Sequence, residues 1–229
     1  MNAVTSDPAP DFRHVRHWVF DLDHTLYTTD AETQKALEER ICRYVQATLD
    51  LPRDPAWDVQ KRYLMEHGST LAGLVRHHGV DPDHYHDAIN DITELNLTKD
   101  DGFRDALARL PGKRFVFTNN CGRFAANVLA GLGVQDLFDG IVDARILMAA
   151  PKPSPASFDA LISRGDIDPT AAAMFDDSVR NLAAAKSRGM KTVWFNTGGG
   201  FSSWKVDDAH LHIDHETDDL AAFLNRIRI

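Results

Sequence analysis

Five short apolar runs along the chain are typical of buried β-strands. Each run is too short for a helix of a globular protein and is followed by polar or turn-forming residues. The runs lie at residues 18–20, 114–118, 141–144, 172–175 and 191–195. We predict that these strands form a sheet that is covered on both faces.

Helical patterns separate the later strands. Phe124, Val128 and Leu132 fall on one face of a predicted helix, and further helices are predicted over residues 155–164 and 178–188. Strands that alternate with helices imply right-handed crossovers and a mostly parallel sheet. The predicted fold class is therefore α/β, with a doubly wound, Rossmann-like core.

The segment between the first two strands breaks this alternation. Leu37 and Ile41 begin a series of apolar residues at helical spacing, and proline and glycine residues punctuate further helical patterns. The segment shows no convincing strand pattern. We predict an inserted, all-helical domain at residues 30–97, so that residues 1–29 and 98–229 form the α/β core.

The C-terminal region carries two further patterns. Alternation from His210 to His215 predicts an edge strand with its histidines facing solvent, and the acidic run from Asp214 to Asp219 predicts the start of a solvated helix. The histidines lack the paired spacing of zinc motifs, so we assign them no metal.

Composition argues against several classes of function. Acidic residues outnumber basic ones by 34 to 25, and the formal net charge of -9 argues against polynucleotide binding. Cys42 and Cys121 lie far apart, without the spacing of a zinc, redox or disulfide motif. Residues 7–17 are polar and charged, and no later run approaches a membrane span. We therefore expect a soluble, cytoplasmic protein with no membrane partner.

Polar residues follow three of the predicted strands at the point where each strand ends. In an open parallel sheet, ligands bind beyond the carboxyl ends of the strands. A lone lysine, Lys152, lies in a proline-stiffened loop ahead of the helix that begins near Pro155. The polar residues that follow strands are Asp21, Asp23, Thr118, Asn119, Asn120, Asp176, Asp177 and Ser178.

The charges of the four aspartates in this set decide its interpretation. Taken singly, an aspartate after a strand is more often a turn former or a helix cap, and Asp177 with Ser178 could cap the following helix. If the aspartates converge, their mutual repulsion costs stability unless a divalent cation and a cationic side chain compensate. The set therefore predicts a metal site, with Lys152 as the added positive charge.

The same residues, in this order, resemble the motifs of the haloacid dehalogenase superfamily of phosphohydrolases. The resemblance covers residues 18–224, and the helical insert resembles the cap that subfamily I places after its first motif. The matching residues are Asp21, Asp23 and Thr25 for the first motif, Thr118 for the second, Lys152 for the third, and Asp176 with Asp177 for the fourth.

The resemblance implies a phosphoryl-transfer role for five residues. Asp21 would attack phosphorus and become an aspartyl phosphate, while Asp23 would donate a proton to the leaving alkoxide and later accept one from water. The Thr118 hydroxyl and the Asn119 backbone N–H would stabilise the phosphoryl oxygens. Lys152 would bridge the nucleophile and one of those oxygens.

The resemblance also implies magnesium as the cofactor. Its expected ligands are the Asp21 carboxylate, the Asp23 backbone carbonyl and Asp177, with Asp176 acting through a bound water. We expect Asn181 to orient the catalytic lysine or the second-motif threonine. Further substrate-side or supporting candidates are His24, Tyr27, Asn120, Thr25 and Ser178.

Asp23 separates two branches of the superfamily. The dehalogenases lack this second aspartate because a departing halide needs no proton, so dehalogenation is not expected. The chain looks most like the pyrimidine 5'-nucleotidase branch, which hydrolyses nucleotides such as UMP and CMP, although that branch usually has Asn at His24 and often Pro at Thr28. The segments that carry this likeness lie at residues 21–27, 118–120, 151–158 and 175–182.

Substrate selection is expected to lie in the cap, which would seal the site and contact the leaving group. Aromatic and polar cap residues could stack on a base or hydrogen-bond to it, although each taken alone is more often a core or surface residue of a small bundle. The candidates are Tyr44, Trp57, Tyr63, His67, Tyr85 and His86.

We expect a small phosphorylated metabolite as substrate, most specifically a nucleoside monophosphate, and a monomer or homodimer. A phosphosugar phosphatase of the phosphoglycolate phosphatase kind, or a phosphomutase, would keep the same catalytic residues. The alternative from another class is a non-catalytic, phosphate-binding regulatory module. The joint presence of Asp21 and Asp23 argues against that alternative.

Overall fold

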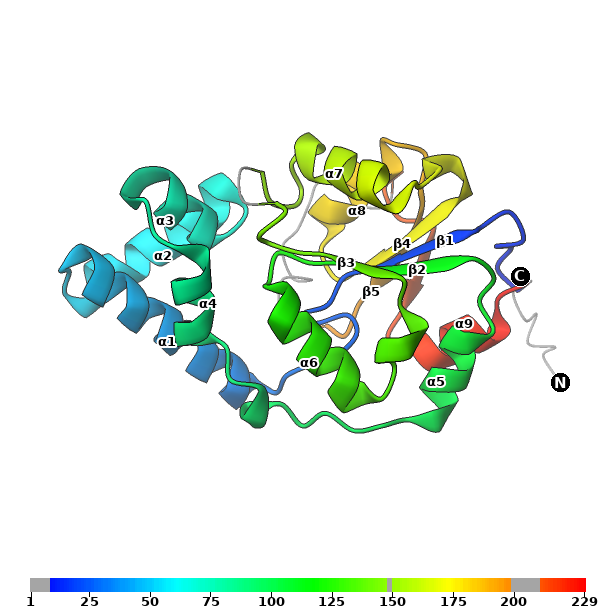
Figure 1. The fold of residues 1–229 in the computed structure, drawn as a ribbon, viewed down its shortest axis with the longest axis horizontal. Coiled ribbons are helices and arrows are strands. Elements are labelled where there is room, and N and C mark those ends of the chain that lie inside the picture. The colour runs from blue at the N-terminus through cyan, green and yellow to red at the C-terminus, as the bar shows by residue number, and fades with distance from the viewer. Residues whose placement is uncertain (1–8, 148–149, 199–210) are drawn as a thin grey trace, which may run out of the picture.

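A single parallel sheet forms the centre of the protein (Figure 1). The computed structural model describes residues 9–147, 150–198 and 211–229. Within them the strand order is β3-β2-β1-β4-β5-β6, which reverses direction beside β1 and so creates a topological switch point between β1 and β4. The strands are β1 (His17–Phe20), β2 (Lys113–Phe117), β3 (Gly140–Val142), β4 (Ala172–Asp176), β5 (Lys191–Phe195) and β6 (His215–Thr217).

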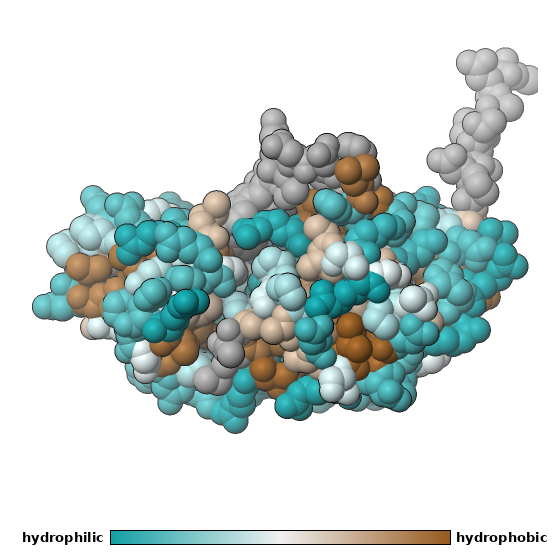
Figure 2. All heavy atoms as spheres, turned by 90° about the horizontal axis from the view of Figure 1, so that it is seen from above, coloured by the Kyte–Doolittle hydropathy of each residue, from teal (hydrophilic) through white to brown (hydrophobic). Residues whose placement is uncertain are grey.

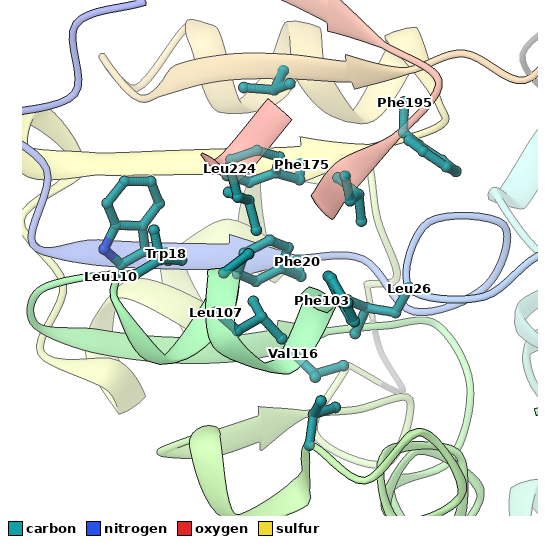
Figure 3. Close-up of a cluster of buried hydrophobic side chains, with 14 of the residues drawn as sticks. Trp18, Phe20, Leu26, Phe103, Leu107, Leu110, Val116, Phe175, Phe195 and Leu224 are labelled. Atoms are coloured by element: carbon teal, nitrogen blue, oxygen red, sulfur yellow. The ribbon is translucent and has the colours of Figure 1, made fainter. Parts of the chain in front are cut away.

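Helices cover both faces of the sheet, because its strands are apolar on both faces (Figure 1). Trp18 and Phe20 of β1 pack into the cluster under α5, α6 and α9, and Figure 3 shows this cluster, whereas Val19 packs into the cluster under α7 and α8. The core helices are α5 (Asp101–Ala108), α6 (Gly122–Leu132), α7 (Pro155–Gly165), α8 (Val179–Lys186) and α9 (Leu220–Arg226), with short 3-10 turns η2 (Gln135–Leu137) and η3 (Pro169–Ala171).

The segment between β1 and α5 is helical and lies beside one end of the sheet (Figure 1). Side chains of Asp30, Ser69 and Asp81 accept hydrogen bonds from backbone N–H groups at the starts of α1, α3 and α4. The segment has a hydrophobic cluster of its own, which includes Val45 and Leu74. Its elements are α1 (Ala31–Leu49), α2 (Arg53–His67), α3 (Thr70–His78), α4 (Pro82–Ile89) and η1 (Ile92–Glu94).

Gly68 brings this helical segment close to the core. It ends α2 with a φ of 81°, a left-handed conformation that glycine adopts without steric cost. A Cβ at this position would lie 2.8 Å from the backbone oxygen of Lys152. The absence of a side chain therefore permits the end of α2 to approach the loop that carries the lysine.

The predicted fold class is confirmed, with differences at particular elements. β3 ends at Val142, two residues before the predicted end, and α5 was not predicted. The predicted edge strand at residues 210–215 is wrong in position, because β6 spans His215–Thr217. The acidic run predicted as a helix start therefore lies partly in a strand, and α9 begins only at Leu220. The solvent-facing orientation is wrong for His215, because its ring packs against Phe12 and Phe223. His210 lies outside the described residues.

The face of the molecule seen in Figure 2 is mostly hydrophilic. Figure 2 shows hydrophobic residues as small, separate patches on the face seen from above. Among the described residues, no helix is both long enough and apolar enough to cross a membrane.

Candidate active site

Three carboxylates and one lysine meet at the carboxyl edge of the sheet. Asp21 directly follows β1 and Asp176 ends β4, and the pairing of Phe20 with Phe175 sets these two positions side by side. The Lys152 ammonium, with a side chain only 1% exposed, lies 2.7 Å from Asp21 and 3.0 Å from Asp176. Ligand oxygens of Asp21, Asp176 and Asp177 all lie within 4.8 Å of one another.

Asn119 holds the backbone of the Lys152 loop. Its side-chain oxygen accepts a hydrogen bond from the Lys152 backbone N–H at 2.9 Å, and its side-chain nitrogen donates to the Lys152 carbonyl at 3.2 Å. This reciprocal pair ties the third motif to the end of β2. This positioning contact of the Asn119 side chain was not predicted, because only its backbone N–H was expected to take part in the site.

The cluster carries more negative than positive charge, which shifts the pKa values of its members. Burial raises the pKa of Asp21, although the positive charge of Lys152 opposes the shift. Burial also raises the pKa of Asp177, and the charges of Asp176 and Asp21 add to the effect. Burial alone would lower the pKa of Lys152, but the charges of Asp176 and Asp21 outweigh it and raise that pKa.

This donor set fits a divalent cation. The Oδ2 atom of Asp177 is buried without a hydrogen-bond partner, an arrangement that costs stability unless a ligand completes it. One lysine also leaves the charge of three neighbouring carboxylates undercompensated. Hard oxygen ligands of this kind suit a small divalent cation, which Asp21, Asp176 and Asp177 would hold.

Asp23 lies in a separate hydrogen-bond group beside this cluster. The Tyr27 hydroxyl donates to its Oδ1 at 2.5 Å, and the Thr118 hydroxyl and Asn120 amide approach the carboxylate at 3.4 to 3.5 Å. Burial and the charge of Asp23 raise the pKa of Tyr27 well above its usual value, so Tyr27 stays a donor. Tyr27, Thr118 and Asn120 therefore converge on Asp23.

Three supporting residues differ in what they contact. Asn181 donates to both carboxylate oxygens of Asp176, at 2.9 and 3.1 Å, whereas the sequence analysis expected Lys152 or Thr118 as its partner. The backbone N–H of Ser178 also donates to Asp176, at 2.8 Å, but the Ser178 side chain makes no cap hydrogen bond. Thr25 is buried and is not among the residues that line the cavity of this site.

A cavity of ≈ 270 Å³ separates the carboxyl edge of the sheet from the helical segment. This volume lies near the lower end of the range of about 300–1,000 Å³ that is typical of ligand sites, which suits a small ligand. The core residues that line the cavity include Asp21, Asp23, His24, Tyr27, Asn119, Asn120, Lys152, Asp177, Ser178 and Asn181.

The six aromatic and polar candidates of the helical segment do not all reach this cavity. Tyr85 and His86 line it. Tyr44 and Tyr63 are instead buried in the hydrophobic cluster of the segment, Trp57 packs under two cationic side chains, and the His67 ring contacts His77. These four residues do not line this cavity, and Tyr44 and Tyr63 are core residues of the helical segment, the interpretation that was favoured for each residue taken alone.

Residues that the sequence analysis missed complete the cavity wall. Gln34 of α1, Gln60 of α2 and Asn90 at the end of α4 all line it. The Asn90 amide donates to the Asn120 side-chain oxygen at 2.8 Å and so joins the helical segment to the group around Asp23. Gln60 lies on the buried face of α2 with Ala56 and Tyr63.

The backbone at His24 explains its place in the first motif. Its φ of 60° lies in the left-handed region, which asparagine, aspartate and histidine tolerate better than most residues. The asparagine that the nucleotidase branch usually has at this position would meet the same backbone requirement. His24 lines the cavity beside Asp23.

The fold and this site define an enzyme of the doubly wound α/β class, with its carboxylates at the switch point of the sheet. Residues 15–189 match the family model described as haloacid dehalogenase-like hydrolase. The chain therefore belongs to the haloacid dehalogenase-like hydrolases, and the membership predicted from the four motifs is confirmed.

Individual relatives show what this chain is similar to. It is 27% identical over 190 residues to Phosphate metabolism protein 8 of Saccharomyces cerevisiae, covering 75% of this chain but only 58% of that protein. It is 26% identical over 188 residues to Fructose-1-phosphate phosphatase YqaB of Escherichia coli, covering 76% of this chain and 93% of that protein. The structure of CbbY from Rhodobacter sphaeroides in complex with phosphate matches with a TM-score of 0.62 and 20% identity, covering 92% of this chain and 99% of that chain.

Proposed function

We propose that this protein is a magnesium-dependent phosphomonoester hydrolase that acts through an aspartyl phosphate on Asp21. The observation that carries the proposal is the buried group of Asp21, Asp176, Asp177 and Lys152 at the edge of a cavity that also contains Asp23. A phosphatase among its relatives supports the same reaction. Phosphate release from a panel of phosphomonoesters, with magnesium and with EDTA, tests it directly.

Asp21 and Asp23 have different roles in the proposed reaction. An Asp21 oxygen attacks phosphorus as the ester P–O bond breaks, and Asp23 gives its proton to the leaving alkoxide. Asp23 then accepts a proton from the water that attacks the phosphoenzyme, and breaking the new P–O bond restores Asp21 and releases phosphate. Tyr27 and Asn120 fix the Asp23 carboxylate through their hydrogen bonds.

Lys152 and the cation balance the charge of this reaction. Lys152 reaches Asp21 at 2.7 Å and is placed to meet one phosphoryl oxygen. Magnesium, held by Asp21, Asp177 and Asp176, would neutralise the charge of the phosphoryl group. Asn181 acts through Asp176, because its amide holds both oxygens of that carboxylate.

Magnesium is expected to raise the melting temperature, and to raise it more at about pH 8 than at about pH 6. The raised pKa values of Asp21 and Asp177 mean that the metal-free folded state binds more protons than the unfolded state, so its stability falls as pH rises above the usual carboxyl range. Protons also compete with the cation for these carboxylates. Thermal denaturation with EDTA and with magnesium at both pH values measures the effect.

Asp177→Asn should abolish most of that magnesium-dependent shift, since it removes a charged oxygen ligand. Asp139→Asn is a matched control, because Asp139 accepts a hydrogen bond from the Arg114 backbone at the opposite edge of the sheet. A shift of the same size in both variants would contradict the assignment of the cation to this cluster.

For the substrate, we propose the pyrimidine 5'-nucleotidase activity of subfamily I, with UMP or CMP as substrate. Its support is the resemblance of the four motif segments, together with a left-handed backbone at His24 that suits the asparagine usual in that branch. A phosphosugar phosphatase is the second candidate, which the similarity to Fructose-1-phosphate phosphatase YqaB favours. The ratio of kcat/KM for UMP to that for fructose 1-phosphate separates the two. A cytoplasmic location and a monomeric or homodimeric state stay predictions.

We also propose that residues 30–97 act as a cap over a core of residues 1–29 and 98–229. Two ion pairs join the cap to the core. Asp83 pairs with Arg145 and Asp87 pairs with Arg123, and both aspartates lie on one face of α4. These side chains are more than half exposed, so the pairs are expected to be individually weak and sensitive to salt.

The double variant Asp83→Asn/Asp87→Asn is expected to raise KM by about two- to tenfold with a smaller change in kcat, because it weakens cap closure. In the unmodified protein, KM should rise with ionic strength, and the double variant should lose most of that dependence. Asp136→Asn, which breaks the surface pair with Arg104 within the core, serves as the control. A double variant with unchanged KM at low salt would show that these pairs do not contribute to closure.

A further inference from the structure

Two buried cap side chains on the cavity wall each hold an unpaired polar atom. Gln60 is 2% exposed and His86 is 4% exposed, and both line the cavity. The Oε1 atom of Gln60 and the Nε2 atom of His86 are buried without a hydrogen-bond partner. Buried polar atoms are normally satisfied, so unpaired polar atoms on two residues that line a cavity point to a ligand that pairs with them.

The hydrogen-bond pattern settles which atom donates at His86. The Cys121 backbone N–H can only donate, and it donates to the Asn120 side-chain oxygen at 2.8 Å. That oxygen therefore also accepts from the Asn90 amide nitrogen at 2.8 Å. The same Asn90 nitrogen lies 3.4 Å from the His86 Nδ1 atom and 3.8 Å from the Cys121 Sγ atom. In the hydrogen bond with His86 the NH2 group donates and Nδ1 accepts, so the matching tautomer of neutral His86 carries its proton on Nε2, the unpaired atom.

Gln60 offers the opposite polarity. Its amide nitrogen donates to the Glu38 backbone carbonyl at 3.3 Å, which assigns the unpaired atom as the carbonyl oxygen. Gln60 and His86 therefore present one acceptor and one donor. A hydroxyl group is an uncharged group that can serve both, since it donates one hydrogen bond and accepts others.

The cap side of the wall offers an ionised leaving group no unpaired lysine or arginine. The described cap residues that line the cavity include one lysine, Lys61, and its ammonium is paired with Glu38 at 2.9 Å, whereas the lining residue Arg180 belongs to α8 of the core. Aliphatic side chains form much of the remaining cap wall, which suits the C–H face of a ring or chain. These residues are Leu37, Ile41, Leu64, Leu71 and Ile89.

We propose that Gln60 and His86 select a phosphomonoester whose leaving group is an uncharged alcohol bearing further hydroxyl groups, such as a free sugar or the ribose of a nucleotide. Gln60 Oε1 accepts a hydrogen bond from one hydroxyl, and His86 Nε2–H donates to a hydroxyl oxygen. This inference rests on the phosphohydrolase activity proposed above. It assigns substrate selection to two residues that touch the leaving group.

Matched substrate pairs test the proposal without any substitution. One pair is ribose 5-phosphate with n-pentyl phosphate, and the other is UMP with its 2',3'-dideoxy analogue. The unmodified protein is expected to prefer the hydroxylated member of at least one pair by about tenfold or more in kcat/KM, because unpaired polar groups reject the analogue that lacks a hydroxyl. The pair with the larger ratio identifies a free sugar or a ribose as the source of the hydroxyls. Ratios near one for both pairs would overturn the proposal.

Substitutions at Gln60 and His86 test whether these two residues select the hydroxylated substrate. Gln60→Leu and His86→Phe should each lower the hydroxylated-to-hydroxyl-free ratio by about fivefold or more. Gln46→Leu, on α1 and outside the cavity lining, should keep the ratio of the unmodified protein. A ratio unchanged in both cavity variants would overturn the assignment. If Gln60→Leu fails to fold by circular dichroism, Gln60→Met and His86→Phe carry the same comparison.

A binding measurement separates failure of this inference from failure of the proposed function. If no phosphomonoester is turned over, the hydrolase proposal fails, and calorimetric titration of Asp21→Asn with ribose 5-phosphate and n-pentyl phosphate still tests the cap wall. Tighter binding of the hydroxylated ligand would support selection by Gln60 and His86. Equal dissociation constants would overturn it.

Discussion

Replacing Asp21 with asparagine is expected to lower kcat for phosphate release by roughly 10⁴-fold or more, because the variant lacks the carboxylate that would attack phosphorus. The asparagine has nearly the same shape, and Lys152 keeps its ion pair with Asp176 at 3.0 Å. Substrate binding should therefore survive the change. Steady-state assays together with equilibrium binding measure the two effects separately.

Two comparisons make the Asp21 result specific. Asp139→Asn changes the same functional group at the opposite edge of the sheet and should keep nearly full activity. Mass spectrometry of the quenched, unmodified enzyme should detect a phosphoryl adduct on Asp21 that the Asp21→Asn protein lacks. Activity in Asp21→Asn above about a tenth of the original would rule out Asp21 as the nucleophile.

The central part of the site could be predicted because topology alone brings it together. Strand ends are local features of the sequence, and parallel strands place all their carboxyl ends at one edge. Asp21, Thr118 and Asp176 follow or end β1, β2 and β4, which are neighbours in the sheet. Their proximity therefore needed no knowledge of side-chain packing.

The cap side of the site could not be predicted in the same way. Which cap residues face the cavity depends on how α1, α2, α3 and α4 pack against one another and dock on the core. Tyr44 and Tyr63 looked suitable as aromatic residues, yet they fill the cluster inside the cap. Gln60 and Asn90 were overlooked because uncharged amides are common on helix surfaces, and only the tertiary structure shows one buried and the other bonded to Asn120.

The short core helix α5 illustrates a different limit. It spans eight residues from Asp101 to Ala108, with Phe103, Ala106 and Leu107 at helical spacing, and Asp100 caps its start through two backbone N–H groups. Isolated helices of this length are unstable, so the helix depends on burying Phe103 and Leu107 against the sheet. The pattern and the cap were both present in the sequence, but over so few residues they do not by themselves establish a helix.

Lys152→Met is expected to lower the free energy of unfolding of the metal-free protein by about 3–5 kcal/mol near pH 8 and to abolish phosphate release. The lysine side chain is only 1% exposed and lies between Asp21 and Asp176. Methionine has a similar length, so the loss comes from buried carboxylates that no longer face a cation. Urea denaturation in EDTA measures the change.

The pH dependence of this loss identifies its electrostatic cause. Lys152 opposes the rise in the pKa of Asp21, so removing the lysine raises that pKa further. A carboxyl group with a raised pKa in the folded state loses stability as pH increases, and the difference between Lys152→Met and the unmodified protein should therefore be smaller at about pH 5 than at about pH 8. Lys191→Met, at the start of β5 and away from the carboxylates, should show a smaller loss without this trend. Equal losses at both pH values would mean that Lys152 stabilises the fold by packing and not by its charge.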